Sequence, residues 1–124
     1  MLLAIADFAL QGLHLAVIAL NLFGWMIARL RLVSFTLQLI TIGFWVGFGA
    51  LKGWWGYCPL THWHWQVKAS LGEQDLPGNY ILYIAEQWFG IAMSHDLSTG
   101  LIAGTFMMAL LINSYLLTRR ISAR

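Results

Sequence analysis

Long runs of apolar residues dominate this chain, and three of them are long enough to form membrane-spanning helices. A helix needs about 20 apolar residues to cross the hydrocarbon core of a bilayer. The three runs extend over approximately residues 2–28, 32–51 and 97–117. The pattern therefore predicts an all-α membrane protein with three transmembrane helices, organised as a single integral membrane domain over residues 1–124.

A polar and aromatic connector, residues 52–96, separates the second and third runs. Pro59 and the sequence LPGN at 76–79 interrupt it. We expect two short helices here, one over residues 61–72 that begins at a threonine N-cap, and one over residues 80–94 that is capped by the asparagine of LPGN. The second is only about 20 Å long, too short to span a bilayer. Both are therefore expected to be interfacial or re-entrant helices of a compact bundle.

Composition supports a membrane protein. Of the 124 residues, 60% are hydrophobic and 10% are charged, whereas soluble domains contain about 25% charged residues. The net charge of +2 comes from arginines near helix ends and not from a basic stripe with exposed aromatic residues, so no nucleic-acid partner is expected. The expected partners are the lipid bilayer and other membrane protein subunits. The single cysteine, Cys58, excludes an internal disulfide.

The basic residues predict an orientation, because lysine and arginine are enriched in cytoplasmic loops. Arg29 and Arg31 follow the first run, and Arg119, Arg120 and Arg124 follow the third. Three spans place both arginine clusters on one side of the membrane and the acidic connector on the other. We therefore expect an N-terminus outside and a cytoplasmic C-terminus.

Tryptophans of the connector are expected to anchor it in the outer headgroup layer, where an indole buries its ring and still meets water. On the first connector helix, the spacing predicts that Trp63, Val67 and Leu71 face inward and that His64 and Lys68 face outward. The predicted interfacial anchors are Trp54, Trp55, Trp63, Trp65 and Trp88.

The segment GYCPLTHWHWQ, residues 56–66, also contains candidate metal ligands. Cys58, His62 and His64 carry the thiolate and imidazole groups that bind zinc or copper. Residues two apart on a helix point about 200° apart, so the two histidines can share one ion only in an extended segment. The amphipathic anchor is therefore the preferred interpretation and the metal site is the alternative. We predict no catalytic residues, since no phosphate-binding loop or paired carboxylates accompany the segment.

A polar stripe lies along one face of the first apolar run. Asp7, Gln11 and His14 fall on one face at 100° per residue. Ionisable residues at membrane depth mark functional sites, so these three are candidate residues for binding haem b or a quinone, or for a proton relay. A haem would need a second axial ligand, and the candidates are His62, Met107 and Met108. The preferred interpretation is that the polar side chains only form hydrogen bonds between helices, and the binding site or proton relay is the alternative.

Small residues predict how the spans pack. Gly43, Gly47 and Ala50 form a small-residue face on the second span, and Gly100 and Gly104 have the same spacing on the third. Such faces let helix backbones approach closely in a membrane. We expect this face of the second span to contact the third, and its opposite, polar face to contact the first.

The sequence Cys-Pro-Leu-Thr at 58–61, the intramembrane His14 and the final hydrophobic span that ends in arginines resemble small bacterial membrane proteins of domain-of-unknown-function family 2784. The resemblance covers nearly the whole chain. It implies a location in the bacterial inner (cytoplasmic) membrane and implies no reaction.

Two functions remain open at this point. The small-residue faces and the absence of convergent catalytic groups favour a non-catalytic accessory or structural subunit that packs against a larger membrane complex. The alternative is an electron or proton transfer protein that binds haem, quinone or a metal and is centred on His14.

Overall fold

The computed structural model describes residues 1–124 and contains only helices. Three long apolar helices and two short ones form a compact bundle, so the predicted fold class is confirmed. The elements are α1 (Leu2–Phe23), η1 (Gly24–Met26), α2 (Arg31–Lys52), α3 (Pro59–Ser70), α4 (Tyr80–Phe89) and α5 (His95–Ser122).

The three long helices have the length and apolar character needed to cross a membrane. The candidate spans are Leu2–Met26, Arg31–Lys52 and His95–Ser122. Many large apolar side chains on these helices are exposed, among them Phe8, Leu51 and Leu111. An apolar surface of this extent is suited to lipid and not to water. The chain is therefore a membrane protein.

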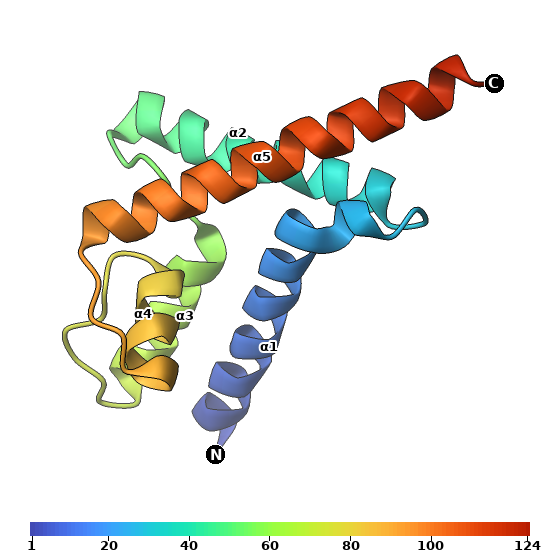
Figure 1. Ribbon diagram of the computed structural model, residues 1–124. Helices are drawn as coiled ribbons and strands as arrows, with labels where there is room; N and C mark the ends of the chain where they lie inside the picture. The colour runs from blue at the N-terminus through green and yellow to red at the C-terminus, as the bar shows by residue number, and fades with distance from the viewer.

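The helices contact one another mainly in two places, where α5 crosses α2 and where the short helices meet α1. Figure 1 shows α5 crossing α2 and extending past it to the C-terminus, with α1 directed away from this crossing. The short helices α3 and α4 lie side by side and face the N-terminal part of α1. The most extensive contact between two helices is that of α1 with α3. The connector is therefore packed against the first span as part of the bundle.

The short helices begin and end at residues that suit a helix terminus. Asn79 accepts a hydrogen bond from the Leu82 amide at 2.7 Å, which confirms the predicted cap of α4. Gly90 adopts a left-handed conformation with φ of 63° and ends α4 before the predicted boundary. The predicted cap of α3 is wrong, because Pro59 begins the helix two residues before Thr61. Proline is favoured at a first helical position since it has no amide hydrogen to leave unpaired.

A polar layer joins α1, α2 and α5 where they cross. Gln38 donates to the backbone carbonyl of Asn21 at 2.8 Å, and Ser34 donates to that of Leu20 at 2.8 Å. From α5, the Asn113 amide nitrogen lies within 3.3 Å of acceptors on Ser34 and Gln38. The predicted contact between the polar face of α2 and α1 is thus confirmed, and the same face also holds α5.

The predicted contact between small-residue faces of α2 and α5 is wrong. A Cβ added at Gly43, Gly47, Gly100 or Gly104 would meet nothing within 4 Å, and Ala50 is exposed. In a membrane, apolar surfaces gain little from leaving lipid, whereas buried amides and hydroxyls must find partners within the protein. The polar layer therefore decides how α5 docks, and the small-residue faces remain open.

Candidate functional site

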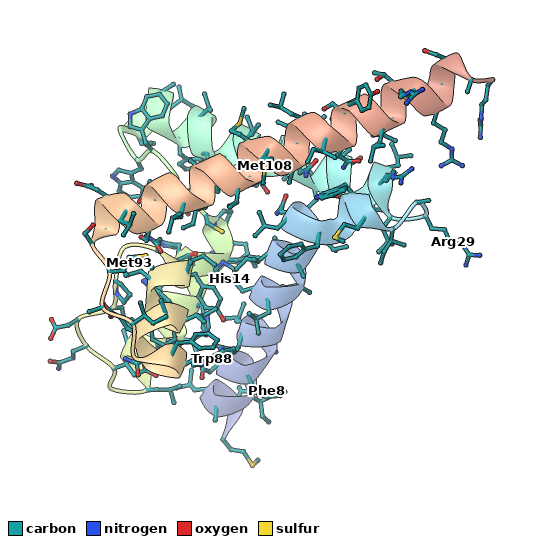
Figure 2. All side chains as sticks on the ribbon, in the orientation of Figure 1. Phe8, His14, Arg29, Trp88, Met93 and Met108 are labelled. Carbon is teal, nitrogen blue, oxygen red and sulfur yellow. The ribbon has the colours of Figure 1, made fainter.

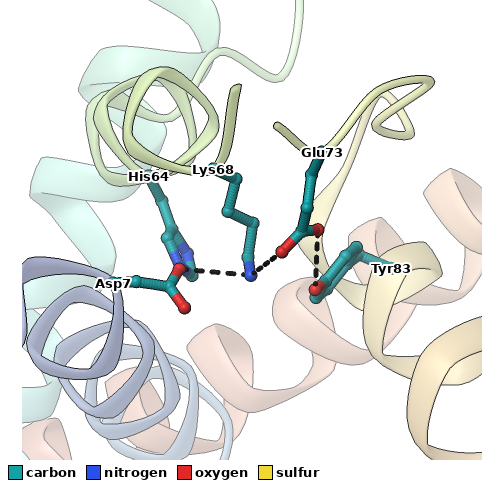
Figure 3. Close-up of polar contacts among 5 residues, drawn as sticks. All are labelled: Asp7, His64, Lys68, Glu73 and Tyr83. Atoms are coloured by element: carbon teal, nitrogen blue, oxygen red, sulfur yellow. Dashed lines mark hydrogen bonds and ion pairs between the residues drawn. The ribbon is translucent and has the colours of Figure 1, made fainter. Parts of the chain in front are cut away.

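Five side chains from α1, α3, α4 and the α3–α4 loop form a polar centre (Figure 3). The Asp7 carboxylate oxygen Oδ1 accepts from His64 Nε2 at 2.8 Å and from Lys68 Nζ at 3.1 Å. Lys68 Nζ also lies 3.1 Å from Glu73 Oε1. The Tyr83 hydroxyl donates to Glu73 Oε2 at 3.3 Å, and its ring lies 4.9 Å from Lys68 Nζ. One ammonium thus joins two carboxylates.

The polar centre exists because two helices present matching polar faces. His64 and Lys68 are four residues apart and lie on one side of α3. That side faces α1, so His64 is 0% exposed and Lys68 is 4% exposed, whereas Trp63 is 56% exposed. The prediction that His64 and Lys68 face outward is therefore wrong. Pairing with Asp7 determines the orientation, since buried charges require a partner.

Lys68 keeps its charge in this environment. Burial lowers the pKa of the Lys68 ammonium, but interactions with Tyr83, Glu73 and Asp7 raise it further than burial lowers it. The net result is a Lys68 pKa above its usual range. The Lys68 ammonium and the carboxylates of Asp7 and Glu73 together carry a net charge of −1.

His14 lies deeper along α1, next to the polar centre. Its ring stacks on the Tyr80 ring of α4 with centroids 3.8 Å apart and 12° between the planes. Its Nε2 atom lies 3.4 Å from the Thr61 hydroxyl of α3. Burial raises the pKa of the Tyr80 hydroxyl to about 12, so this hydroxyl keeps its proton at neutral pH.

An open groove of about 600 Å³ runs along the polar centre between α1 and α4. Figure 2 shows Phe8 on the α1 side and Trp88 on the α4 side. Asp7, Gln11 and Lys68 are its polar lining residues. The remaining walls consist of apolar and aromatic side chains and small residues, which are Ala4, Phe8, Gly12, Leu15, Tyr83 and Trp88.

The structure places the three candidate cofactor residues of α1 in two environments. Asp7 and Gln11 line the groove, and His14 is buried behind it. Asp7 meets a histidine of the connector, His64. None of the contacts of the polar centre uses the Gln11 amide, which leaves it available to a molecule in the groove.

The candidate metal ligands are not brought together. His64 pairs with Asp7, while the exposed His62 contacts Gln66 at 3.1 Å. Cys58 precedes α3 as its N-cap residue. No group of three or more His, Cys, Asp or Glu side chains is arranged to hold a metal ion.

A haem does not fit the surroundings of His14. Tyr80 covers one face of the His14 ring, and the proposed second ligands lie elsewhere. His62 is exposed on α3, and Met107 and Met108 are exposed on α5. A pair of axial ligands at matched depth is therefore missing.

Several residues of the site were not predicted as site residues. They are Thr61, Lys68, Glu73, Tyr80 and Tyr83. A signal for two of them was present, because Thr61, His64 and Lys68 recur at intervals of three and four and so form one polar face of a helix. The same spacing relates Asp7, Gln11 and His14 on α1. Glu73 and the two tyrosines reach the site only through the fold of the loop and α4.

Comparison with known protein families finds a matching family. The family described as "Protein of Unknown function (DUF2784)" matches residues 4–118. The chain belongs to this family. The matched range of this DUF2784 protein includes the polar centre, the groove, His14 and Tyr80. No curated protein and no solved structure matches the chain.

Proposed function

We propose that this DUF2784 protein binds an amphiphilic molecule in the groove between α1 and α4, with the head group of that molecule donating a hydrogen bond to Asp7. One observation carries the proposal. Both partners of the Asp7 carboxylate contact Oδ1, so Oδ2 has no protein partner, and the side chain is 26% exposed at the groove. A carboxylate oxygen of this kind accepts from a donor that enters the groove.

The rest of the groove suits an amphiphile. Its volume of about 600 Å³ lies within the range of small-molecule sites, which is about 300–1,000 Å³. Phe8, Leu15 and Trp88 supply apolar and aromatic walls for a hydrocarbon or ring system, and the Gln11 amide offers a second polar contact. His64 and Lys68 hold Asp7 in place, so the acceptor is preorganised.

Charge and hydrogen-bonding capacity define the class of ligand. The net negative charge of the polar centre disfavours an anionic head group, and the free acceptor favours a donor. Two sources supply this chemistry in a membrane, namely the phenolic hydroxyl of a quinol and the ammonium or hydroxyl of a lipid headgroup. The quinone site was expected at Asp7, Gln11 and His14; the proposal keeps Asp7 and Gln11, which line the groove, and takes the reduced quinol as the ligand.

Methylated analogues test the proposal because methylation removes the donor. The purified protein in detergent micelles is titrated, with native mass spectrometry as the readout, with a short-chain hydroquinone and with its dimethyl ether. Phosphatidylethanolamine is compared with phosphatidylcholine in the same way. We expect the donor of one pair to bind at least about tenfold more tightly than its methylated partner, since a hydrogen bond to a charged group contributes about 1.5–3 kcal/mol. The pair that discriminates identifies the source.

Two glycine variants locate the site. Gly12 lines the groove, and a Cβ there meets nothing within 4 Å, so Gly12→Phe fills the groove without disturbing the polar centre. Gly43 has equally open surroundings on α2, away from the groove, and Gly43→Phe is the matched control. We expect only Gly12→Phe to abolish binding. Equal binding of donor and methylated analogues, or unchanged binding by Gly12→Phe, contradicts the proposal.

We also propose a second role, that of an accessory subunit packed against a larger membrane complex. Its support is that Gly43 and Gly47 on α2, and Gly100 and Gly104 on α5, border open space. Close helix packing in membranes uses faces of this kind. In cross-linked native membranes, Gly43→Phe and Gly104→Phe should reduce the yield of a specific adduct, whereas Gly12→Phe should not. An adduct yield that is the same in all three variants contradicts this role.

We propose that the protein resides in the bacterial inner membrane with its N-terminus outside and its C-terminus cytoplasmic. Support comes from Arg119 and Arg120, which lie in the last turn of α5, and from Arg29, which lies in the α1–α2 turn. Four of the predicted aromatic anchors have exposed indole rings available to the headgroup layer, and these are Trp54, Trp55, Trp63 and Trp88. Trp65 instead donates to the Pro77 carbonyl at 2.8 Å.

A further inference from the structure

Three buried polar atoms on adjacent rings have no hydrogen-bond partner. They are Nδ1 of His14, Nδ1 of His64 and the hydroxyl of Tyr80. All three residues are buried, and the ring centroids lie 3.8 Å apart for His14 and Tyr80, 5.7 Å for His64 and Tyr80, and 6.5 Å for His14 and His64. Buried polar atoms are nearly always paired. Three unpaired atoms in one cluster therefore indicate a bound species that the chain does not itself supply.

The neighbouring contacts define what this species must offer. The ionised Asp7 carboxylate can only accept, so His64 carries its hydrogen on Nε2 and, when neutral, presents a lone pair at Nδ1. A His14 ring that donates from Nε2 to the Thr61 hydroxyl likewise presents a lone pair at Nδ1. The Tyr80 hydroxyl has a hydrogen to donate. The missing partner must therefore donate twice and accept once.

The ring spacing distinguishes a water molecule from a metal ion. Two imidazoles on one zinc ion have centres at most about 6.3 Å apart, and about 5 Å apart at the tetrahedral angle, because the Zn–N bond is about 2.0–2.1 Å. Two imidazoles that accept from one water have centres about 6–6.5 Å apart at the angle of water, because the N···O distance is about 2.8 Å. The observed 6.5 Å agrees with water.

We propose that one water molecule is bound between His14 and His64, donates to Nδ1 of both rings and accepts from the Tyr80 hydroxyl. This water joins His14 to the pair of His64 and Asp7, and so forms a continuous hydrogen-bonded path from the interior of α1 to the groove. The charged and titratable groups that face the path are Asp7 of α1, Lys68 of α3, Glu73 of the loop and Tyr83 of α4.

The path moves one proton at a time. A His14 ring that carries hydrogens on both nitrogens gives its Nδ1 hydrogen to the water, the water gives one of its own hydrogens to Nδ1 of His64, and that ring releases its Nε2 hydrogen to the Asp7 carboxylate. The step leaves His14 neutral, His64 with its hydrogen on Nδ1, and Asp7 protonated. The reverse sequence carries a proton from Asp7 inward. Use of this path by a donor molecule in the groove rests on the proposed function, whereas the water site does not.

Solid-state NMR of the full chain in lipid bilayers, without added ligand, tests the water site. With ¹⁵N-labelled histidine, we expect magnetisation transfer from a slowly exchanging water to Nδ1 of both His14 and His64, each with the chemical shift of an unprotonated, hydrogen-bonded nitrogen. Tyr80→Phe removes the donor to the water without opening space, and should reduce both transfers at least about twofold. Tyr115→Phe, which changes an exposed hydroxyl on α5, is the matched control and should leave both unchanged.

Two results overturn the inference. If no magnetisation is transferred from water to either ring, the cluster holds no water. If added Zn²⁺ shifts both Nδ1 resonances stoichiometrically, the cluster is a metal site. Spectra of the wild-type protein with and without Zn²⁺ decide both points, so a Tyr80→Phe protein that does not fold leaves the test intact. Loss of amphiphile binding with an intact water signal would contradict the proposed function and leave the water site standing.

Discussion

The Asp7 carboxylate of α1 lies 3.1 Å from the Lys68 ammonium of α3, and this ion pair connects the first span to the connector. The side chain of Lys68 is almost fully buried, and Asp7 and Glu73 are its only anionic partners. A buried charge that loses its partner is strongly unfavourable, because it keeps neither hydration nor a counter-charge. The pair therefore holds α3 against α1 and also positions the acceptor of the groove.

Removing the ammonium should destabilise the protein. We expect Lys68→Met to lower the free energy of unfolding by roughly 2–4 kcal/mol, because it leaves the Asp7 and Glu73 carboxylates facing each other without a cation. Unfolding by sodium dodecyl sulfate in mixed micelles measures the change. Lys52→Met, at an exposed lysine at the end of α2, is the control and should change stability by less than about 0.5 kcal/mol. Equal stabilities of the two variants would show that the ion pair does not hold α3 against α1.

The docking of α5 should depend on Asn113. Its amide nitrogen contacts Ser34 and Gln38 at 3.3 and 3.2 Å, together with the Arg31 carbonyl at 3.1 Å. We expect Asn113→Ala to destabilise by about 1–3 kcal/mol, because it leaves these buried groups of α2 without their partner. The neighbouring Ser114 only bonds within its own helix, to the Leu110 carbonyl, so Ser114→Ala should have little effect. The same unfolding assay compares the two variants. An Asn113→Ala protein with an unchanged free energy of unfolding would show that the polar layer is not the docking contact of α5.

Stability should fall at alkaline pH, partly through Tyr80. Its pKa is raised from 10.0 to about 12 by burial, so the folded protein keeps a proton that the unfolded chain loses. The corresponding stability is complete below pH 10 and decreases as the pH rises toward 12, and the raised pKa of Lys68 acts in the same direction above 10.5. We expect Tyr80→Phe to show a smaller loss of unfolding free energy over this interval than wild type or Tyr115→Phe. Identical slopes would indicate that the hydroxyl is not buried.

Two glycines should differ sharply in their tolerance of alanine. A Cβ at Gly24 would lie 2.7 Å from Cβ of Ser34, whereas one at Gly43 would meet nothing within 4 Å. We expect Gly24→Ala to destabilise by about 1–3 kcal/mol through overpacking at the α1–α2 contact. Gly43→Ala should be neutral or stabilising, since alanine is the better helix former. Thermal unfolding in detergent measures both, and a tolerated Gly24→Ala would contradict the close approach.

The single cysteine provides a direct test of orientation. Cys58 is partly exposed at the start of α3. We expect a membrane-impermeant maleimide to label it in intact spheroplasts, where the outer surface is accessible. A Cys58→Ser protein with Ser122→Cys at the end of α5 should be labelled only after lysis. The opposite pattern would reverse the proposed orientation.

The helical framework was predictable because its causes are local. Apolar runs of sufficient length, together with Asn79 as a cap, are read from neighbouring residues. The polar face of α2 was also predictable, since Ser34, Gln38 and Thr41 recur at helical spacing. Asp7, Gln11 and His14 were recognised as candidates for the same reason.

The packing partners of these faces were not predictable in the same way. Trp63 and His64 are neighbours, and an amphipathic pattern does not say which side of α3 meets lipid and which meets α1. The small-residue faces of α2 and α5 predicted a contact between these helices, but α5 docks on α2 through the buried Asn113 instead. Glu73 and Tyr80 carry no pattern of their own, and only the loop and α4 bring them to Lys68 and His14.

The sequence by itself determined that this protein consists of three apolar spans and a polar aromatic connector, because hydropathy and helix termini depend on residues close together in the chain. Only the tertiary structure decided that the connector folds back on α1 and that Asp7, His64 and Lys68 share one buried centre beside a groove. The physical reason is that buried polar and charged groups must be paired, and the partner that satisfies each one is chosen among distant residues when the helices pack.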